Sequence, residues 1–150
     1  MNDIIIFTVI GTPKPGGSKT AFPTKSGRIA IVDASGKKGR EWRQDVKHEA
    51  LRAMEGKEIL ENCAIDISAT FHMPRPKSHY FTGKRAGVLR PDAPLYHTNK
   101  PDATKLFRSV EDACTGIVWK DDCMIARQYI VKVYCEEKTM GGVSMVIRKL

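Results

Sequence analysis

The sequence predicts a single α+β domain, in which a mixed β-sheet is flanked by two main helices. Three observations support this prediction: a length of 150 residues, several β-branched segments, and two segments whose apolar residues recur at helical spacing. A chain of this length can bury one sizeable hydrophobic core. We therefore expect residues 1–150 to form one domain.

The expected strands are rich in β-branched residues. Ile4–Gly11 predicts a buried strand, and Arg28–Asp33 predicts a further strand. The residues between them, 12–27, are rich in Pro, Gly, Lys and Ser, which predicts a loop. Cys63–Met73 predicts another strand, and Val143–Lys149 predicts the last one.

The first helix is predicted over Gly39–Met54. Within it, Trp42, Val46 and Ala50 recur at the spacing of one helix face, which indicates that this face is buried. Gly56 follows closely and is a suitable residue for ending the helix.

The second helix is predicted from a single apolar stripe with i, i+3, i+4 spacing. The stripe consists of Ala103, Leu106, Phe107, Val110, Cys114 and Ile117. Asn99 is expected to cap this helix, Pro101 to lie in its first turn, and Gly116 to end it. Residues 117–119 and 124–134 then predict two strands of a hairpin, joined by a turn at residues 120–123.

The charge balance is strongly basic. Lys and Arg number 25 against 17 acidic residues, which gives a net charge of +8 and a pI of about 9.4. A small basic domain indicates a polyanionic partner, of which nucleic acid is the commonest. Charge that serves solubility, or attachment to a membrane surface, remains the alternative.

Neither a membrane span nor a signal peptide is expected. No apolar run approaches the roughly 20 residues that a span requires. An acid, Asp3, stands where a signal peptide has basic residues, and the four cysteines form no C-x-x-C pair. We expect a cytoplasmic protein.

Two basic segments are candidates for contact with DNA. The first is the predicted loop over residues 12–27, and the second is the long proline-containing segment over residues 74–100, because loops of that length are usually functional or disordered. The residues expected to contact backbone phosphates are Lys14, Lys19, Lys77, Lys84, Arg85 and Arg90. Such contacts predict a strong dependence of binding on salt.

Three carboxylates flank the second predicted helix. Asp102 lies at its start, and Asp121 and Asp122 lie in the turn that follows it. Taken singly, Asp102 could stabilise the helix dipole, and the other two could form the turn. If the chain after the helix folds back along it, however, the carboxylates gather into an oxygen site suited to Mg²⁺, of the kind that hydrolyses phosphodiesters. Asp66, in the preceding strand, is a weaker candidate for a further ligand.

The run KPDATKLFRSVEDACTGIVWKDDCMI, residues 100–125, resembles the signature region of the RusA family of Holliday junction resolvases. The family pattern reads roughly K-P-D-x-D-N-L-x-K-x-x-x-D-A-L-x-G-x-x-x-x-D-D-x-Q-[IV]. The positions that match without a gap are Lys100, Pro101, Asp102, Leu106, Asp112, Ala113, Gly116, Asp121, Asp122 and Ile125. The Pro/Gly/Lys segment after the first strand also resembles the opening of the family, so the resemblance spans nearly the whole chain.

The resemblance implies a homodimeric, Mg²⁺-dependent endonuclease that resolves four-way DNA junctions by paired symmetric nicks; Mn²⁺ could replace Mg²⁺. Asp102 and Asp122 match aspartates that bind metal in the family, and Asp121 matches the acid beside them. On this basis Asp102, Asp121 and Asp122 are expected to bind metal. Arg108 and Lys105 are expected to act on the scissile phosphate.

The sequence also departs from the family pattern. Thr104 replaces the second aspartate of P-D-x-D and supplies no anionic ligand, while Arg108 stands at the position of the catalytic lysine. Arg108 keeps the positive charge but does not readily act as an acid. Lys105, three residues away on the same side of the helix, could share that role. Asp112 could supply a replacement carboxylate if it points toward the site.

Two other functions remain open from the sequence. One is a junction-binding protein whose site no longer cleaves DNA. The other is a basic module that binds RNA or another protein and uses its acids structurally.

Overall fold

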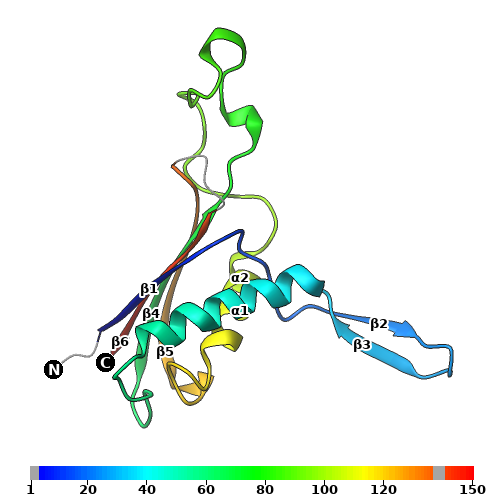
Figure 1. Cartoon of the computed structure of the whole chain (residues 1–150), viewed down its shortest axis with the longest axis vertical. Coiled ribbons are helices and arrows are strands. Elements are labelled where there is room, and N and C mark those ends of the chain that lie inside the picture. Colours follow the sequence, from blue (N-terminus) through cyan, green and yellow to red (C-terminus); the bar gives the residue numbers. More distant parts are fainter. Residues whose placement is uncertain (1–3, 137–140) are drawn as a thin grey trace.

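A four-stranded mixed sheet forms the centre of the molecule in the computed structural model, which describes residues 4–136 and 141–150 (Figure 1). In spatial order, its strands are β1 (Ile4–Ile10), β6 (Gly142–Lys149), β4 (Ile65–Met73) and β5 (Ile125–Tyr134). Strand β6 is antiparallel to both of its neighbours, whereas β4 and β5 are parallel. The predicted α+β class with one mixed sheet is confirmed.

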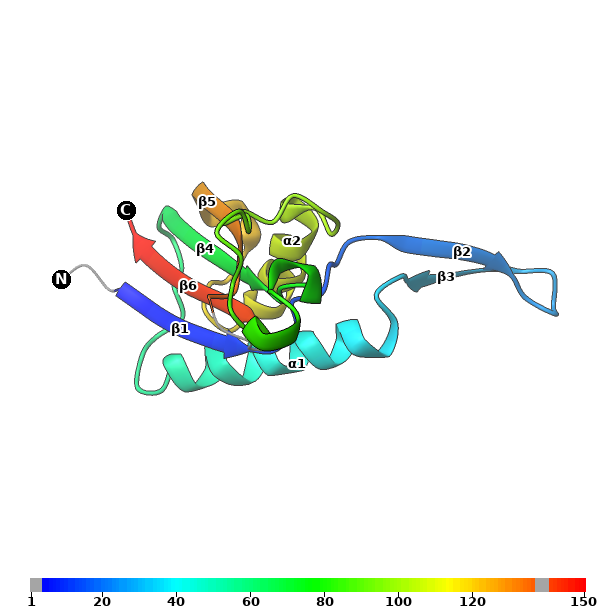
Figure 2. The same cartoon turned by 90° about the horizontal axis from the view of Figure 1, so that it is seen from above.

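Both main helices, α1 (Gly36–Ala53) and α2 (Ala103–Cys114), pack on the same face of this sheet (Figures 1 and 2). Because successive residues of a strand point to opposite faces of the sheet, only every second side chain of β1 faces the helices. Ile5, Phe7 and Val9 are buried beneath α1, whereas Ile4 and Ile6 are exposed on the other face. The core therefore lies between the helices and one face of the sheet.

The helices form where the apolar periodicity predicts them. Trp42, Val46 and Ala50 of α1 are buried. Of the stripe of α2, Leu106, Phe107, Val110 and Cys114 are buried, whereas Ala103 and Ile117 at its two ends are partly buried. The N-cap position of α2 is occupied by Asp102 rather than by Asn99, because Asn99 lies further upstream in the segment that leads to the helix. Gly116 follows the last turn of α2 with φ +81°, a backbone conformation that favours glycine, as predicted for a helix end.

The hairpin predicted after α2 is wrong. Residues 117–119 form no strand, and Trp119 makes only isolated bridges, to Leu60 and Thr115. Strand β5 pairs with β4 in the parallel direction instead. Helix α2 lies in the connection between these two strands, and such a connection joins parallel neighbours rather than a hairpin.

The loop predicted over residues 12–27 is wrong in part. Residues Lys19–Pro23 form β2, which pairs antiparallel with β3 (Ile29–Asp33). This two-stranded hairpin projects away from the four-stranded sheet (Figures 1 and 2). Apolar residues of this hairpin are exposed, including Ile29 and Ile31. The hairpin therefore lacks the alternation of buried and exposed residues by which a strand of the core is recognised in a sequence.

The segment between β4 and α2, residues 74–102, extends beyond the end of the sheet in Figure 1. It contains two short 3₁₀ helices, η1 (Lys77–His79) and η2 (Gly83–Arg85), and a bridge between Tyr80 and Leu89. Within the described ranges, no helix has both the length and the apolar character that crossing a bilayer requires.

Candidate active site

The exposed side of α2 borders a polar groove. One part of the groove lies between α2 and the residues that lead into β2, and it is lined by Gly16, Gly17, Ser18, Lys19, Asp33, Thr104, Lys105, Arg108 and Asp112. An adjoining pocket shares Ser18, Asp33 and Lys105 with it and extends to Asp102. The groove therefore follows the helix from its N-terminus almost to its C-terminus.

Two glycines let the chain lie directly against α2. The amide of Gly16 donates a hydrogen bond to the carbonyl oxygen of Lys105 at 2.9 Å. A Cβ atom at Gly16 would lie 3.0 Å from the Cα atom of Ser109, which is tighter than ordinary packing allows. Gly17 adopts φ +76°, which favours glycine. The glycine pair thus brings the basic segment that contains Lys19 against the polar side of α2.

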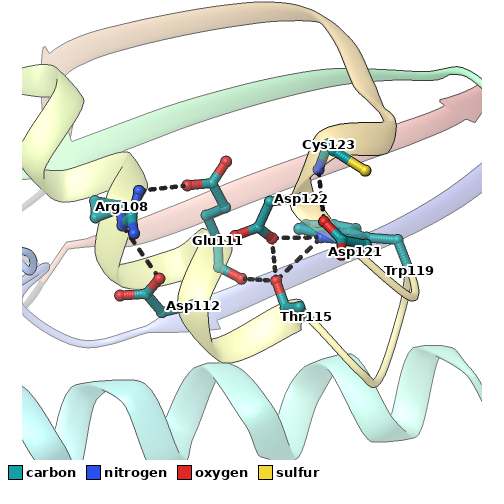
Figure 3. A network of polar contacts seen from close by, with 8 residues as sticks. All are labelled: Arg108, Glu111, Asp112, Thr115, Trp119, Asp121, Asp122 and Cys123. Carbon is teal, nitrogen blue, oxygen red and sulfur yellow. Dashed lines mark hydrogen bonds and ion pairs between the residues drawn. The ribbon is translucent and has the colours of Figure 1, made fainter.

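Three carboxylates meet near the C-terminal end of α2. Glu111 and Asp112 belong to the helix, and Asp122 follows it at the start of the 3₁₀ helix η3 (Asp122–Met124). Each supplies one oxygen atom, and these oxygens lie within 4.8 Å of one another. Figure 3 shows Arg108 beside the cluster, with its guanidinium 3.2 Å from Asp112 and 3.8 Å from Glu111.

The cluster concentrates more negative charge than its surroundings neutralise. Glu111 is only 9% exposed, and this burial, followed by the negative charge of Asp122, raises the pKa of its carboxyl group. Arg108 acts in the opposite direction but does not cancel the effect. Glu111 is buried, Asp122 is partly buried and Asp112 is exposed, so the cluster is open to solvent on one side. Carboxylates whose oxygens lie this close together, with Arg108 as the basic neighbour, fit a hard divalent cation such as Mg²⁺.

Asp122 is held by hydrogen bonds from two neighbouring side chains (Figure 3). The indole N–H of Trp119 donates to its Oδ1 atom at 3.1 Å, and the hydroxyl of Thr115 donates to the same atom. Trp119 is fully buried in the core. The rest of the domain therefore determines where this carboxylate lies.

The acids predicted to bind metal are not brought together as one set. Asp102 lies ten residues before Asp112, which corresponds to about 15 Å along the helix axis. Its carboxylate is 3.4 Å from the Nζ atom of Lys105, so these two predicted residues lie together at the other end of the groove. The metal-binding role of Asp102 stays a prediction.

Asp121 accepts its hydrogen bond from the backbone, whereas Asp122 accepts hydrogen bonds from two side chains. The Asp121 carboxylate accepts a hydrogen bond of 2.9 Å from the backbone amide of Cys123, and this bond lowers the pKa of Asp121. The contact caps η3 and is the turn chemistry that the sequence left open. Asp66 lies on the opposite face of the sheet, where it is paired with Arg127 at 2.8 Å and with Arg148 at 3.5 Å. The buried carboxylate of Asp66 is thus neutralised by two exposed arginines, away from the groove.

Glu111 is the member of the cluster that sequence reasoning missed. A signal was present, because Glu111 lies four residues after Phe107 and three before Cys114, both of which belong to the apolar stripe. Helical spacing therefore places Glu111 at the edge of the buried face. An acid at such a position is a candidate for function.

The predicted DNA-contacting residues lie in two regions. Lys14 and Lys19 flank the part of the chain that packs on α2, and Lys19 lines the groove. Lys77, Lys84, Arg85 and Arg90 lie in the extension between β4 and α2. Two of them already have partners there: the guanidinium of Arg85 stacks 3.8 Å from the centre of the Phe81 ring, and Arg90 pairs with Asp92 at 3.1 Å.

Lys132 of β5 fixes the approach to α2. Its Nζ atom donates to the carbonyl oxygens of Asn99 at 2.8 Å and of Pro101 at 2.6 Å. We expect Lys132→Met to lower the free energy of unfolding by about 1–3 kcal/mol, because the methionine keeps the apolar stem but leaves two carbonyl groups unpaired. Urea denaturation of the two proteins measures this difference. An unchanged midpoint would show that water replaces the lysine at no cost.

Comparison with known proteins agrees with this geometry. The sequence profile of the family described as "Endodeoxyribonuclease RusA" matches residues 14–145. The chain belongs to the RusA family. That match includes the groove, the whole of α2 and the turn that carries Asp122. A curated relative is the uncharacterized protein YqaN of Bacillus subtilis strain 168, which is 29% identical over an alignment of 145 residues that covers 90% of this chain and 91% of that protein.

Membership of the RusA family makes this chain one of a family of endodeoxyribonucleases. It also makes the departures from the family pattern informative. Thr104, which replaces a carboxylate of the RusA pattern, lines the groove two turns before Asp112. The acidic cluster also contains a carboxylate that the RusA pattern does not specify, that of Glu111, which stands at a variable position of the pattern.

Proposed function

We propose that this protein is a metal-dependent endonuclease that resolves four-way DNA junctions by paired symmetric nicks. The observation that supports this proposal most strongly is the cluster of Glu111, Asp112 and Asp122 beside Arg108, in a member of the RusA family. Of these residues, Asp112 and Arg108 line the groove. A basic chain with a net charge of +8 is suited to a DNA substrate.

In the proposed site, Glu111, Asp112 and Asp122 would hold a divalent cation, with Mg²⁺ as the physiological ion and Mn²⁺ as a substitute. Such a cation supplies Lewis-acid polarisation of a phosphoryl oxygen and activation of a water molecule. Arg108, whose guanidinium borders both the cluster and the groove, would bind the scissile phosphate and stabilise its developing charge. Lys105 would bind a neighbouring phosphate further along the groove.

Asp102 remains a proposed metal-binding residue because it matches an aspartate of the family motif. It lies in the same groove as Arg108 but beside Lys105, so its contribution is separable from that of Asp122 by mutation. A homodimer is the proposed assembly, because two matched cuts in a two-fold junction require two equivalent sites, which C₂ symmetry supplies.

The proposal is tested by a nicking assay. The purified protein is incubated with a labelled four-way junction and with a linear duplex of matched sequence, each in Mg²⁺, in Mn²⁺ and in EDTA. We expect paired nicks in the junction alone, only when metal is present, and binding that weakens steeply as salt rises.

Thr104 favours one alternative, a protein that binds junctions without cutting them. Tight binding of the junction with no nicks in either metal would establish that alternative. Binding that does not distinguish the junction from linear duplex or from RNA at matched salt would favour the basic interaction module instead.

A further inference from the structure

The hydrogen bonds of Asp122 converge on one of its two carboxylate oxygens. Trp119 and Thr115 both donate to Oδ1 (Figure 3). Among residues 4–136 and 141–150, no hydrogen bond or ion pair reaches Oδ2. One oxygen is therefore fixed by the protein, while the second remains available to another partner.

The bonding pattern at Thr115 leaves its hydroxyl proton for Asp122. The Thr115 oxygen also lies 2.9 Å from the carbonyl oxygen of Glu111, and a hydroxyl has only one proton to donate. That carbonyl already accepts the backbone amide of Thr115 at 3.0 Å. The ionised carboxylate is also the stronger acceptor, so the hydroxyl bonds to Asp122. The indole nitrogen of Trp119 lies 3.2 Å from the same hydroxyl oxygen. Thr115, Trp119 and Asp122 thus form a triangle of three mutually contacting polar groups.

Trp119 provides a rigid support for this triangle. Its side chain is 0% exposed, and its carbonyl oxygen accepts the amide of Gly116 at 2.7 Å. The residues on either side are tied to Leu60, which donates to Val118 at 2.9 Å and accepts from Lys120 at 3.0 Å. The indole therefore cannot move without disturbing the connection between α1 and β4.

Without these bonds, Asp122 would be expected to turn away from the cluster. It carries the same charge as Glu111 and Asp112, and like charges this close repel each other. It is also only partly buried, so solvent is within reach. The two donors thus oppose a rotation that electrostatics favours in the absence of a cation.

We propose that Thr115 and Trp119 are positioning residues, which hold the Asp122 carboxylate in the orientation that binds a divalent cation. The same contact makes the Trp119 indole a reporter of whether the cation is bound. This inference rests on the proposed metal-dependent function, and it assigns roles to two residues that lie outside the acidic cluster itself. In metal sites, residues that orient a ligand typically change metal affinity by about 10- to 100-fold when they are mutated.

The first test uses the fluorescence of Trp119 during titration with Mn²⁺ alone. Trp42, the other tryptophan, is replaced in all variants by phenylalanine; its buried indole nitrogen has no hydrogen-bond partner among the described residues, so this change removes no bond. In this background we expect Mn²⁺ to change the emission of Trp119. Thr115→Val should raise the dissociation constant for Mn²⁺ by about 10-fold or more, whereas Thr115→Ser, which keeps the hydroxyl, should stay near the parent value.

The second test removes the indole N–H. Trp119→Phe cannot report by fluorescence, so free Mn²⁺ is measured by its electron paramagnetic resonance signal. We expect a similar loss of affinity. Ser109→Ala is the matched control, because Ser109 also carries a buried hydroxyl on α2, and that hydroxyl has no partner within the described part of the chain. This variant should bind Mn²⁺ as the wild type does.

The outcomes separate the inference from the proposed function. If the wild type binds Mn²⁺ and nicks junctions, but Thr115→Val binds Mn²⁺ equally well, the positioning roles are wrong and the nuclease proposal stands. If the wild type binds no Mn²⁺ and makes no nicks, both fail. Thermal melting in EDTA checks that each variant is folded, and Thr115→Val decides the question if Trp119→Phe does not fold.

Discussion

Asp122→Asn is expected to lower the rate of junction cleavage by about 10²- to 10³-fold or more, while leaving junction binding intact. That range is typical for removal of one group that stabilises charge in a transition state. The asparagine retains the size of the side chain and an oxygen for Trp119 and Thr115, but it lacks the negative charge that a cation needs. Binding measured in EDTA should persist, because neither protein then holds a cation and the loss of a negative charge cannot weaken attraction to phosphate.

Single-turnover cleavage and gel-shift assays on the same junction measure these two effects separately. Asp121→Asn is the sharpest comparison, because it removes the same negative charge from the neighbouring residue. The Asp121 carboxylate accepts a hydrogen bond from the amide of Cys123 and is not part of the acidic cluster. We expect Asp121→Asn to cost far less cleavage than Asp122→Asn. Asp102→Asn shows whether the family aspartate acts from the other end of α2. Equal cleavage by Asp122→Asn and wild type would refute the proposed site.

Glu111→Gln is expected to have opposite effects on the protein with and without metal. The folded-state pKa of Glu111 is raised, mainly by burial, so its ionisation opposes folding. Below its unfolded-state pKa the residue is neutral in both states, and stability is lost as the pH rises through the raised folded-state pKa. At neutral pH in EDTA, glutamine should therefore raise the melting temperature, and the gain should disappear at low pH.

With metal present, we expect the wild type to have the higher melting temperature of the two proteins. At a Mn²⁺ concentration 100 times the dissociation constant, binding stabilises the folded state by about 2.7 kcal/mol. For a domain of this size, that corresponds to a rise in melting temperature of roughly 5–10 °C. Glu111→Gln should show a much smaller rise. Thermal melts of both proteins in EDTA and in Mn²⁺ measure this, and equal metal-induced shifts would exclude Glu111 from the metal site.

The parts of the site that could be predicted are those marked by local pattern. The stripe of Leu106, Phe107 and Val110 identifies α2 because helix formation follows a spacing of three and four residues. The match to the RusA signature identified Asp122 because motif acids keep fixed positions in the sequence. Glu111 escaped because no motif marks it, although its position on the stripe was a usable signal.

The sequence by itself determined the basic charge, the two helices, the core strands and the signature acids, since these depend on composition and on short-range spacing. Only the tertiary structure decided that β5 lies parallel to β4, which removes the expected hairpin and brings Asp122 to the C-terminal end of α2. It likewise decided that Asp102 and Asp122 lie near opposite ends of α2. The physical reason is that strand pairing and the meeting of distant carboxylates depend on the path of the chain through the whole domain, which local periodicity does not encode.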